Sequence, residues 1–197
     1  MSKPVPDLKR AIRLELRERR RNRTSTQVSR DTRALTTHLT ELVAELGAKS
    51  VSVYLSLPSE PDVRPFIEWA IARDIRVLLP SSRDDGLLDW IAASADFEEE
   101  IGLHGVPEPA GDVLGPVAIN DVDLILVPAA SVDHQGTRLG WGRGYFDRTL
   151  GSMARRPPVF AIVFSDELVD DLPRELHDSP VDGVVTPDGV TRFSSKG

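Results

Sequence analysis

Short, almost uninterrupted apolar segments alternate with longer segments of helical periodicity, and this alternation constrains the fold of the chain more than any other feature. We expect the apolar segments to be strands, and they comprise residues 50–55, 75–79, 87–92, 123–127, 159–164 and 181–185. Strands that are apolar on both faces are typical of a parallel sheet covered on both sides. The sequence therefore predicts an α/β fold, a single domain over residues 1–197 with three α/β/α layers and a mostly parallel, Rossmann-like sheet.

Helices are expected between these strands and at the N-terminus. Asp7 is the predicted N-cap of a first helix that runs to about Arg21. Thr24 and Gln27 form a predicted capping box for a second helix, which Gly47 ends. Further helices are expected at 62–73, 145–150 and, as a short one, 165–169. In such folds ligands bind at the carboxyl ends of the strands, and the candidate residues below follow strands in this way.

A glycine-rich run lies between the strand at 123–127 and the helix at 145–150. Glycines 136, 140, 142 and 144 make a poor helix or strand, since each costs roughly 0.5–1 kcal/mol relative to Ala. Arg138 and Arg143 lie among them and Asp147 ends the run. Backbone N–H donors, guanidinium groups and one carboxylate suit a phosphate with a divalent cation. The spacing matches neither G-x-x-x-x-G-K-[ST] nor G-x-G-x-x-G, so the residues alone leave a tight structural connection open.

Composition excludes several classes of protein. The chain has no cysteine, which excludes disulfides, cysteine metal clusters and a thiol nucleophile. No apolar run reaches the roughly 20 residues of a membrane helix, and the basic N-terminus lacks the apolar core of a secretory signal. We therefore expect a cytoplasmic protein with no membrane partner.

Positive charge is concentrated at the N-terminus. Residues 1–33 hold 11 Lys and Arg against 4 Asp and Glu, whereas the whole chain has a net charge of −7. Lys9, Arg13 and Arg17 share one helical face, which is either a solvated basic face or an anion contact; residues 19–21 are expected to be solvated. An RNA- or nucleotide-binding module that uses this arm is an alternative function. Because the remainder is acidic, we expect no nucleic-acid partner.

The segment 127–148 resembles the signature of the 5-formyltetrahydrofolate cyclo-ligases, also called methenyltetrahydrofolate synthetases. That signature reads roughly V-P-x-x-x-F-D-x-x-G-x-R-L-G-x-G-x-G-Y-Y-D-R, and the chain follows it without a gap. Val132 replaces the usual Phe, and Phe146 replaces the second Tyr and lacks its hydroxyl. Further segments resemble the family in the same order, namely Lys9 with Arg13, 54–60, 105–109, His177-Asp178 and 181–182.

The resemblance implies an enzyme that binds ATP and Mg²⁺ and cyclises 5-formyltetrahydrofolate to 5,10-methenyltetrahydrofolate, releasing ADP and phosphate. Phosphorylation makes the formyl oxygen a leaving group, and N10 of the substrate then attacks the formyl carbon. No enzymic nucleophile is needed, which agrees with a chain that lacks cysteine. We expect it to act as a monomer. The alternative is an ATP-dependent enzyme of the same fold that acts on another formylated or amide substrate.

The resemblance also implies roles for individual residues. The expected catalytic residues are Arg138, Arg143 and Tyr145, and the expected ATP-binding residues are Lys9, Arg13, Arg138, Leu139, Gly140, Trp141, Gly142, Arg143, Gly144, Tyr145 and Phe146. Folate binding is assigned to Leu55, Glu60, Trp141 and Tyr145, and Mg²⁺ binding to Asp147 and Asp182. Without the resemblance, Glu60 is equally explained as a turn carboxylate and Asp147 as a residue that stabilises a helix start.

Overall fold

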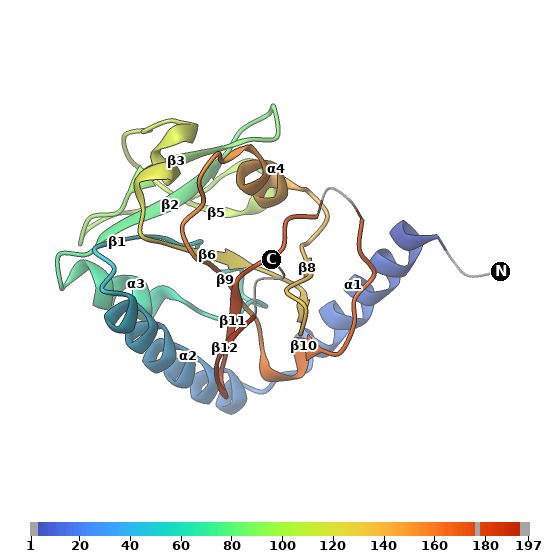
Figure 1. The fold of residues 1–197 in the computed structure, drawn as a ribbon. Coiled ribbons are helices and arrows are strands. Elements are labelled where there is room, and N and C mark those ends of the chain that lie inside the picture. The colour runs from blue at the N-terminus through green and yellow to red at the C-terminus, as the bar shows by residue number, and fades with distance from the viewer. Residues whose placement is uncertain (1–3, 176–177, 194–197) are drawn as a thin grey trace.

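The structure is a computed structural model that describes residues 4–175 and 178–193, so position 177 lies outside the described residues. Its centre is a seven-stranded sheet of order β12-β11-β9-β6-β1-β2-β3 (Figure 1). The five inner strands pair in parallel, and the edge strands β3 and β12 are antiparallel to their neighbours. The strands are β1 Ser50–Ser52, β2 Arg76–Ser82, β3 Leu88–Ala92, β6 Leu124–Pro128, β9 Val159–Ile162, β11 Gly183–Thr186 and β12 Gly189–Arg192.

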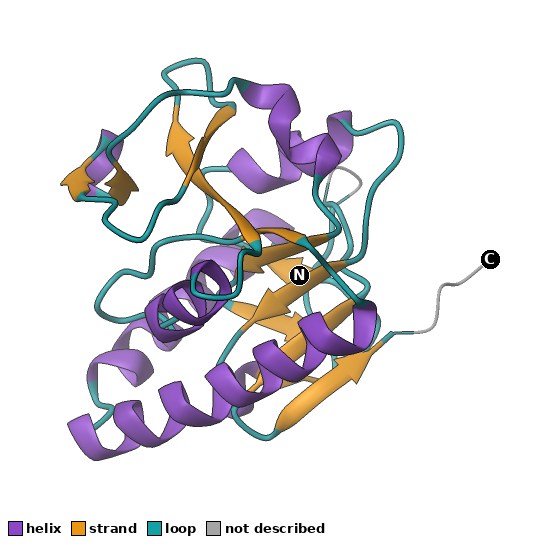
Figure 2. Cartoon of the chain, turned by 90° about the vertical axis from the view of Figure 1, so that its left-hand side faces the viewer, coloured by secondary structure: helices purple, strands orange, loops and turns teal. Residues whose placement is uncertain are grey.

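Helices cover both faces of this sheet, which confirms the predicted three-layer α/β arrangement (Figure 2). On one face lie α2 and α3; on the other lie α4 and the 3-10 helix η2. Successive residues of β6 alternate between the two cores, with Leu124 and Leu126 facing α2 and Ile125 and Val127 the opposite layer. The bounds are α2 Ser25–Leu46, α3 Arg64–Ile71, α4 Tyr145–Ser152 and η2 Pro116–Asp121. The continuous apolar strands follow directly from burial on both faces.

Helix α1, Val5–Arg21, packs on a second, smaller sheet rather than on the central one. Its Leu16 joins Leu139 and Leu172 in a separate apolar cluster. The small sheet has the order β10-β7-β8, from Leu168–Val169, Ser131–Asp133 and Arg138–Leu139. Strands of two or three residues carry too little apolar periodicity to be predicted from sequence.

Most of the predicted boundaries hold within a few residues, and the exceptions have clear causes. The Thr24–Gln27 capping box is present, and Gly47 ends α2 with φ of +63°. The first helix begins at Val5, with Pro4 rather than Asp7 as its N-cap. The strand predicted at 50–55 ends at Ser52, where the chain leaves the sheet toward the site. The segment 101–118, expected to be a loop, contains most of a hairpin, β4 Glu99–Ile101 and β5 Pro107–Pro109 with η1 Leu103–Gly105 between them.

Candidate active site

Two adjoining pockets lie where β1, β2 and β6 reach their carboxyl ends. The first, which we call the Glu60 pocket, is lined by the segment after β1, by Pro80 and Ser82 of β2, by Pro128 and by the glycine-rich run. The second, the Lys9 pocket, is lined by α1, the same run and the segment 174–180. Both pockets share Arg138, Gly140, Arg143, Gly144 and Asp147. The run is therefore a common wall.

Glu60 lies at one end of the Glu60 pocket and is 8% exposed. One carboxylate oxygen accepts a hydrogen bond from the Leu57 N–H at 2.9 Å, an interaction that fixes the turn after β1. Burial raises the pKa of Glu60, and the Leu57 N–H and the charge of Arg20 offset this only in part. Glu60 thus closes a turn and also lines a pocket, and its role in folate binding stays a prediction.

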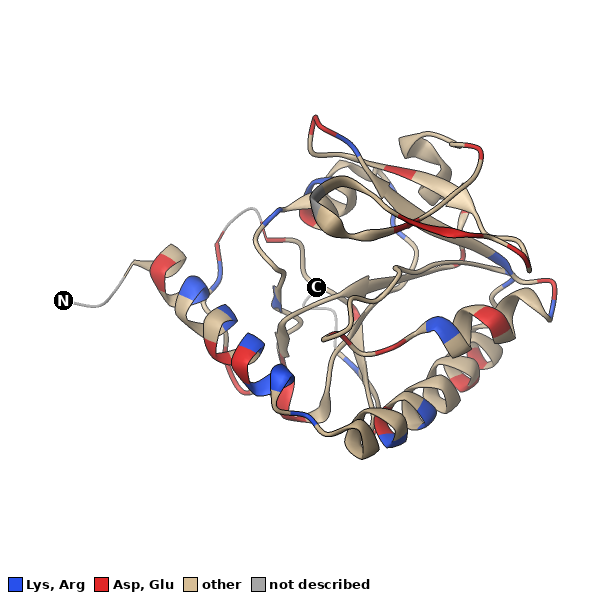
Figure 3. Ribbon diagram, turned by 180° about the vertical axis from the view of Figure 1, so that it is seen from behind, with Lys and Arg blue, Asp and Glu red and all other residues tan. Residues whose placement is uncertain are grey.

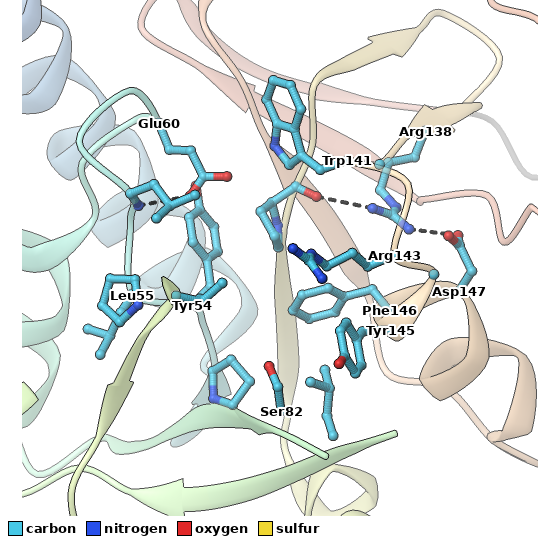
Figure 4. Close-up of a pocket in the computed structure, with 18 residues that line it drawn as sticks. Tyr54, Leu55, Glu60, Ser82, Arg138, Trp141, Arg143, Tyr145, Phe146 and Asp147 are labelled. Carbon is cyan, nitrogen blue, oxygen red and sulfur yellow. Dashed lines mark hydrogen bonds and ion pairs between the residues drawn. The ribbon is translucent and has the colours of Figure 1, made fainter. Parts of the chain in front are cut away.

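Aromatic side chains line the Glu60 pocket, as Figure 4 shows. Trp141 faces Glu60 across it, while Tyr145 and Phe146 lie on the side of α4. The Tyr145 hydroxyl donates to the carbonyl of Arg83 at 3.2 Å, which ties α4 to the turn between β2 and β3. Leu55 is buried beside Glu60. A flat, partly polar ring would fit between such apolar walls.

Arg138 and Asp147 form an ion pair within the shared wall. Arg138 is 4% exposed, and its Nη2 lies 2.6 Å from Oδ1 of Asp147. Its Nη1 donates to the carbonyl of Pro128 at 3.1 Å, which links the end of β6 to α4. A Cβ at Gly140 would lie 2.9 Å from this guanidinium, so glycine is required for the close approach. Arg138 therefore holds the shared wall in place and also gives it positive charge.

Arg143 differs from Arg138 because its guanidinium is uncommitted. The side chain is exposed, lines both pockets and has no hydrogen bond or ion pair among the residues that the structure describes. Figure 4 shows it directed toward the middle of the Glu60 pocket. Its backbone carbonyl accepts a hydrogen bond from Arg148 Nη2 at 2.8 Å, which orients this part of the run. A cation at the boundary of two pockets that no described residue engages is suited to binding a transferred anion.

Lys9 and Arg13 of α1 line the Lys9 pocket together with the run and with residues 174, 175 and 178–180. Figure 3 shows the basic residues of α1 in blue along the helix. Lys9 is 5% exposed, and its Nζ lies 2.8 Å from Glu175 and 2.6 Å from Asp178. Burial lowers the pKa of Lys9, but these two carboxylates outweigh it and the net shift is upward. Arg13 Nε donates to the carbonyl of Gly140 at 2.7 Å. These two residues are thus part of the site, which weakens the alternative of a free RNA-binding arm.

Three glycines of the run adopt backbone conformations that other residues rarely take. Gly136, Gly142 and Gly144 have φ of +82°, +98° and +72°. Gly136 forms the turn between β7 and β8, and Gly144 is the N-cap of α4. Leu139 is buried in the small apolar cluster beneath the run, so its side chain anchors the wall from behind.

Asp182 is not brought to Asp147. It precedes β11, and its Oδ2 accepts from the Val159 N–H at 2.8 Å, which joins the amino ends of β9 and β11. Its Oδ1 lies 3.8 Å from Arg156, and it lines a different pocket. Within residues 4–175 and 178–193, no three His, Asp or Glu side chains gather as metal ligands. The two aspartates thus line different pockets, and their expected pairing on one Mg²⁺ stays a prediction.

Other residues of the site escaped sequence reasoning. Arg20, expected to be solvated with its neighbours, is 3% exposed and paired with Glu167, which is 1% exposed. The Tyr54 hydroxyl is buried and has no hydrogen-bond partner in the described part of the chain. The Trp141 N–H is also buried and has no hydrogen-bond partner in that part of the chain. It lies close enough to Glu60 to favour the ionised carboxylate, although it is outside hydrogen-bonding geometry. Nothing in one sequence separates Arg20 from the exposed Arg19 and Arg21.

Comparisons with known proteins give a consistent result. Residues 6–187 match the 5-formyltetrahydrofolate cyclo-ligase family. A 5-formyltetrahydrofolate cyclo-ligase of Mycolicibacterium smegmatis is 36% identical over 150 residues, which cover 73% of this chain and 76% of that protein. One of Escherichia coli is 31% identical over 182 residues, with 89% and 98% covered. The structure of Aquifex aeolicus 5,10-methenyltetrahydrofolate synthetase aligns with a TM-score of 0.80 at 27% identity, covering 96% and 95%.

Among the helices of the described residues, none combines the length and the apolarity that crossing a bilayer requires.

Proposed function

Because the chain belongs to the 5-formyltetrahydrofolate cyclo-ligase family, we propose that it closes 5-formyltetrahydrofolate to 5,10-methenyltetrahydrofolate while converting ATP to ADP and phosphate. The observation that carries this proposal is the common wall of the two pockets. A folate in the Glu60 pocket and ATP phosphates in the Lys9 pocket would meet across residues 140–144. Residues from Lys9 to Asp178 build this one site, which supports a single working domain.

The chemistry requires positioning and charge stabilisation. The formyl oxygen attacks the γ-phosphorus of ATP, the bond from that phosphorus to the bridging oxygen breaks, and ADP leaves. N10 then attacks the formyl carbon, loses its proton, and the carbon–oxygen bond breaks with release of phosphate. Arg143 lines both pockets and would contact the phosphoryl group as it passes from one to the other. Arg138 and the N–H groups of the run would add positive charge at fixed positions.

The folate half of the site is assigned to the Glu60 pocket. The carboxylate of Glu60 would accept hydrogen bonds from the amino group and ring N–H of the pterin, a charge-assisted bidentate match. Leu55, Trp141, Tyr145 and Phe146 would enclose the ring. Phe146 would contact the ring through its apolar side chain, so this enclosure does not need the hydroxyl that Phe146 lacks.

A magnesium ion is assigned to Asp147 alone. Its Oδ1 is held by Arg138, while its Oδ2 has no partner among the described residues and the side chain is 19% exposed. One carboxylate fits Mg²⁺, which completes its octahedron with phosphate oxygens and water. The bound ion would neutralise negative charge on the phosphates.

Asp147→Asn should raise the Mg²⁺ concentration for half-maximal activity about tenfold or more, because an amide oxygen lacks the charge that favours Mg²⁺. The measurement is an Mg²⁺ titration of the initial rate at fixed ATP. Asp182→Asn is the matched control and should keep the wild-type midpoint, since Asp182 faces another pocket. Equal shifts in both variants would contradict the assignment and restore the pair expected from sequence.

Gly144→Ala should lower the free energy of unfolding by about 1–2 kcal/mol, because its φ of +72° strains any other residue. It should also raise KM for ATP, since a Cβ would lie 2.9 Å from the Arg148 guanidinium and would displace the group that donates to the Arg143 carbonyl. Gly47→Ala is the control, with φ of +63° and no atom within 4 Å of its Cβ. It should lose similar stability by denaturant titration and keep the wild-type KM; identical kinetics in both variants would contradict the role of the run.

The activity is tested by incubating the protein with 5-formyltetrahydrofolate, Mg²⁺ and ATP and following the near-ultraviolet absorbance of the product. We expect an absorbance increase that needs both ATP and the folate, with one ADP formed per product. Folded protein that produces no ATP-dependent change would contradict the proposed function.

A further inference from the structure

A buried ion pair lies behind the Glu60 pocket. The Arg20 guanidinium binds Glu167 through two hydrogen bonds, Nε to Oε1 at 2.7 Å and Nη2 to Oε2 at 2.8 Å. Its Nη2 also donates to the carbonyl of Ala129 at 2.8 Å. Both side chains are almost inaccessible to solvent. The pair thus fixes α1 against η3, Ser165–Glu167, and against the segment that follows β6.

The pair also contacts the residues that line the pocket. The Arg20 guanidinium carbon lies over the ring of Trp141, 4.8 Å from its centroid, in cation–π geometry, so it packs against one face of that indole. Trp141 in turn faces Glu60 (Figure 4). Arg20, Tyr54 and Glu167 are also close enough to Glu60 to influence its charge. The pair therefore lies one layer behind the groups assigned to the folate.

Stability is not a sufficient reason for such a pair. Two charges removed from water cost more than they return unless their geometry is excellent, and replacement of both by apolar residues is often neutral or stabilising. The cluster also holds three buried donors without a hydrogen-bond partner in the described part of the chain, Arg20 Nη1, the Tyr54 hydroxyl and Trp141 Nε1. Buried donors without a hydrogen-bond partner lower the stability of the folded protein. Such local costs are typical of functional sites.

We propose that the Arg20–Glu167 pair is a positioning element of the folate half of the site: Arg20 sets the orientation of Trp141 and supplies the positive charge that favours the acceptor form of Glu60. This inference rests on the proposed function. Arg20 itself does not line the Glu60 pocket, so it acts through Trp141 and Glu60 rather than on the substrate.

The electrostatics agree with this role. Burial raises the pKa of Glu60, and the Leu57 N–H, Arg20 and the Trp141 N–H lower it, in that order, while Glu167 raises it. Tyr54, the remaining titratable neighbour, is neutral because burial raises its own pKa well above the usual range. Arg20 outweighs Glu167 in its effect on Glu60. Removal of the pair should therefore raise the pKa of Glu60 further.

The test is the double variant Arg20→Met/Glu167→Met, which removes both charges together, so neither partner is left as an unpaired buried ion. We expect KM for 5-formyltetrahydrofolate to rise about threefold at all pH values, because Trp141 loses its cation–π partner. We also expect the pH below which KM increases to move upward, because the pKa of Glu60 rises when Arg20 is removed. KM for ATP should stay within about twofold. The control removes a matched exposed pair of the same helix, Arg19→Met/Glu15→Met, and should behave as wild type.

A second variant, Arg20→Lys, keeps the charge but loses the planar fork. It should raise KM for the folate with no shift of its pH profile, and it decides the question if the double variant does not fold. The role of the pair would be overturned if the folded double variant had wild-type KM values across the pH range. If only Arg20→Lys folds, wild-type KM values in that variant would overturn it. A wild-type protein that forms no product would overturn the proposed function instead.

Discussion

Arg143→Met should lower kcat about 10²–10³-fold, the usual effect of removing one group that stabilises transition-state charge. Arg143 is the cation that both pockets share and that no described residue engages, so its charge is available to the transferred phosphoryl group. The substitution keeps a long, flexible chain and leaves the ion pair of Arg138 and Asp147 in place. Because Arg143 is exposed and unpaired, the melting temperature should change by no more than about 2 °C.

The effect should appear in kcat more than in KM, because the charge it stabilises develops during transfer. Steady-state rates of product formation at varied ATP and folate separate these constants. Arg33→Met, a change of an exposed arginine on α2, is the control for the loss of one positive charge. If Arg143→Met kept kcat within threefold of wild type, Arg143 would have no part in phosphoryl transfer.

Glu60→Gln should raise KM for 5-formyltetrahydrofolate about 100-fold while stabilising the protein at neutral pH. An amide cannot accept two N–H donors as a carboxylate does, and hydrogen bonds to a charged group contribute about 1.5–3 kcal/mol. Glu68→Gln, on the exposed side of α3, is the matched control. An unchanged KM in Glu60→Gln would mean that the pterin lies elsewhere or that the substrate is not a folate.

The stability effect of Glu60→Gln has a defined pH dependence. Burial raises the pKa of Glu60 in the folded protein, above the value of about 4.3 for an exposed glutamate. The native state therefore holds this proton more tightly than the unfolded chain. The stability of the wild-type protein should fall as the pH rises from about 4.3 through the native pKa of Glu60, and the loss should be constant above that pKa. The melting temperature of Glu60→Gln should exceed that of wild type at pH 7–8, and the difference should vanish below about pH 4.3.

Sequence patterns predicted the central layers well because those layers depend on apolar periodicity. The strands β6 and β9 are buried on both faces, and this leaves a continuous apolar segment in each. The small sheet β10-β7-β8 was not predicted, because its strands of two and three residues are held by pairing between distant segments. The hairpin of β4 and β5 pairs neighbouring segments, and it was missed because each strand has only three residues.

The candidate site was predicted only in part, because the sequence shows local features of the chain and not the contacts between distant segments. Glycine spacing and the resemblance located the run, whose positive φ values at Gly142 and Gly144 are local properties. Partnerships across the chain were not visible. Arg20 looked like its exposed neighbours, and only the placement of η3 reveals Glu167 as its partner. Asp182 was matched to a metal role, but the register of β11 with β9 directs it to the start of a strand.

The central claim is that the glycine-rich run separates a folate pocket from a phosphate pocket and that the phosphoryl group crosses it. A crystal structure with 5-formyltetrahydrofolate, Mg²⁺ and a non-hydrolysable ATP analogue tests this most directly. We predict the pterin against Glu60, the triphosphate beside Arg13, and the formyl oxygen facing the γ-phosphate near Arg143. A pterin bound away from Glu60, or a γ-phosphate on the far side of the run from the formyl group, would contradict the account.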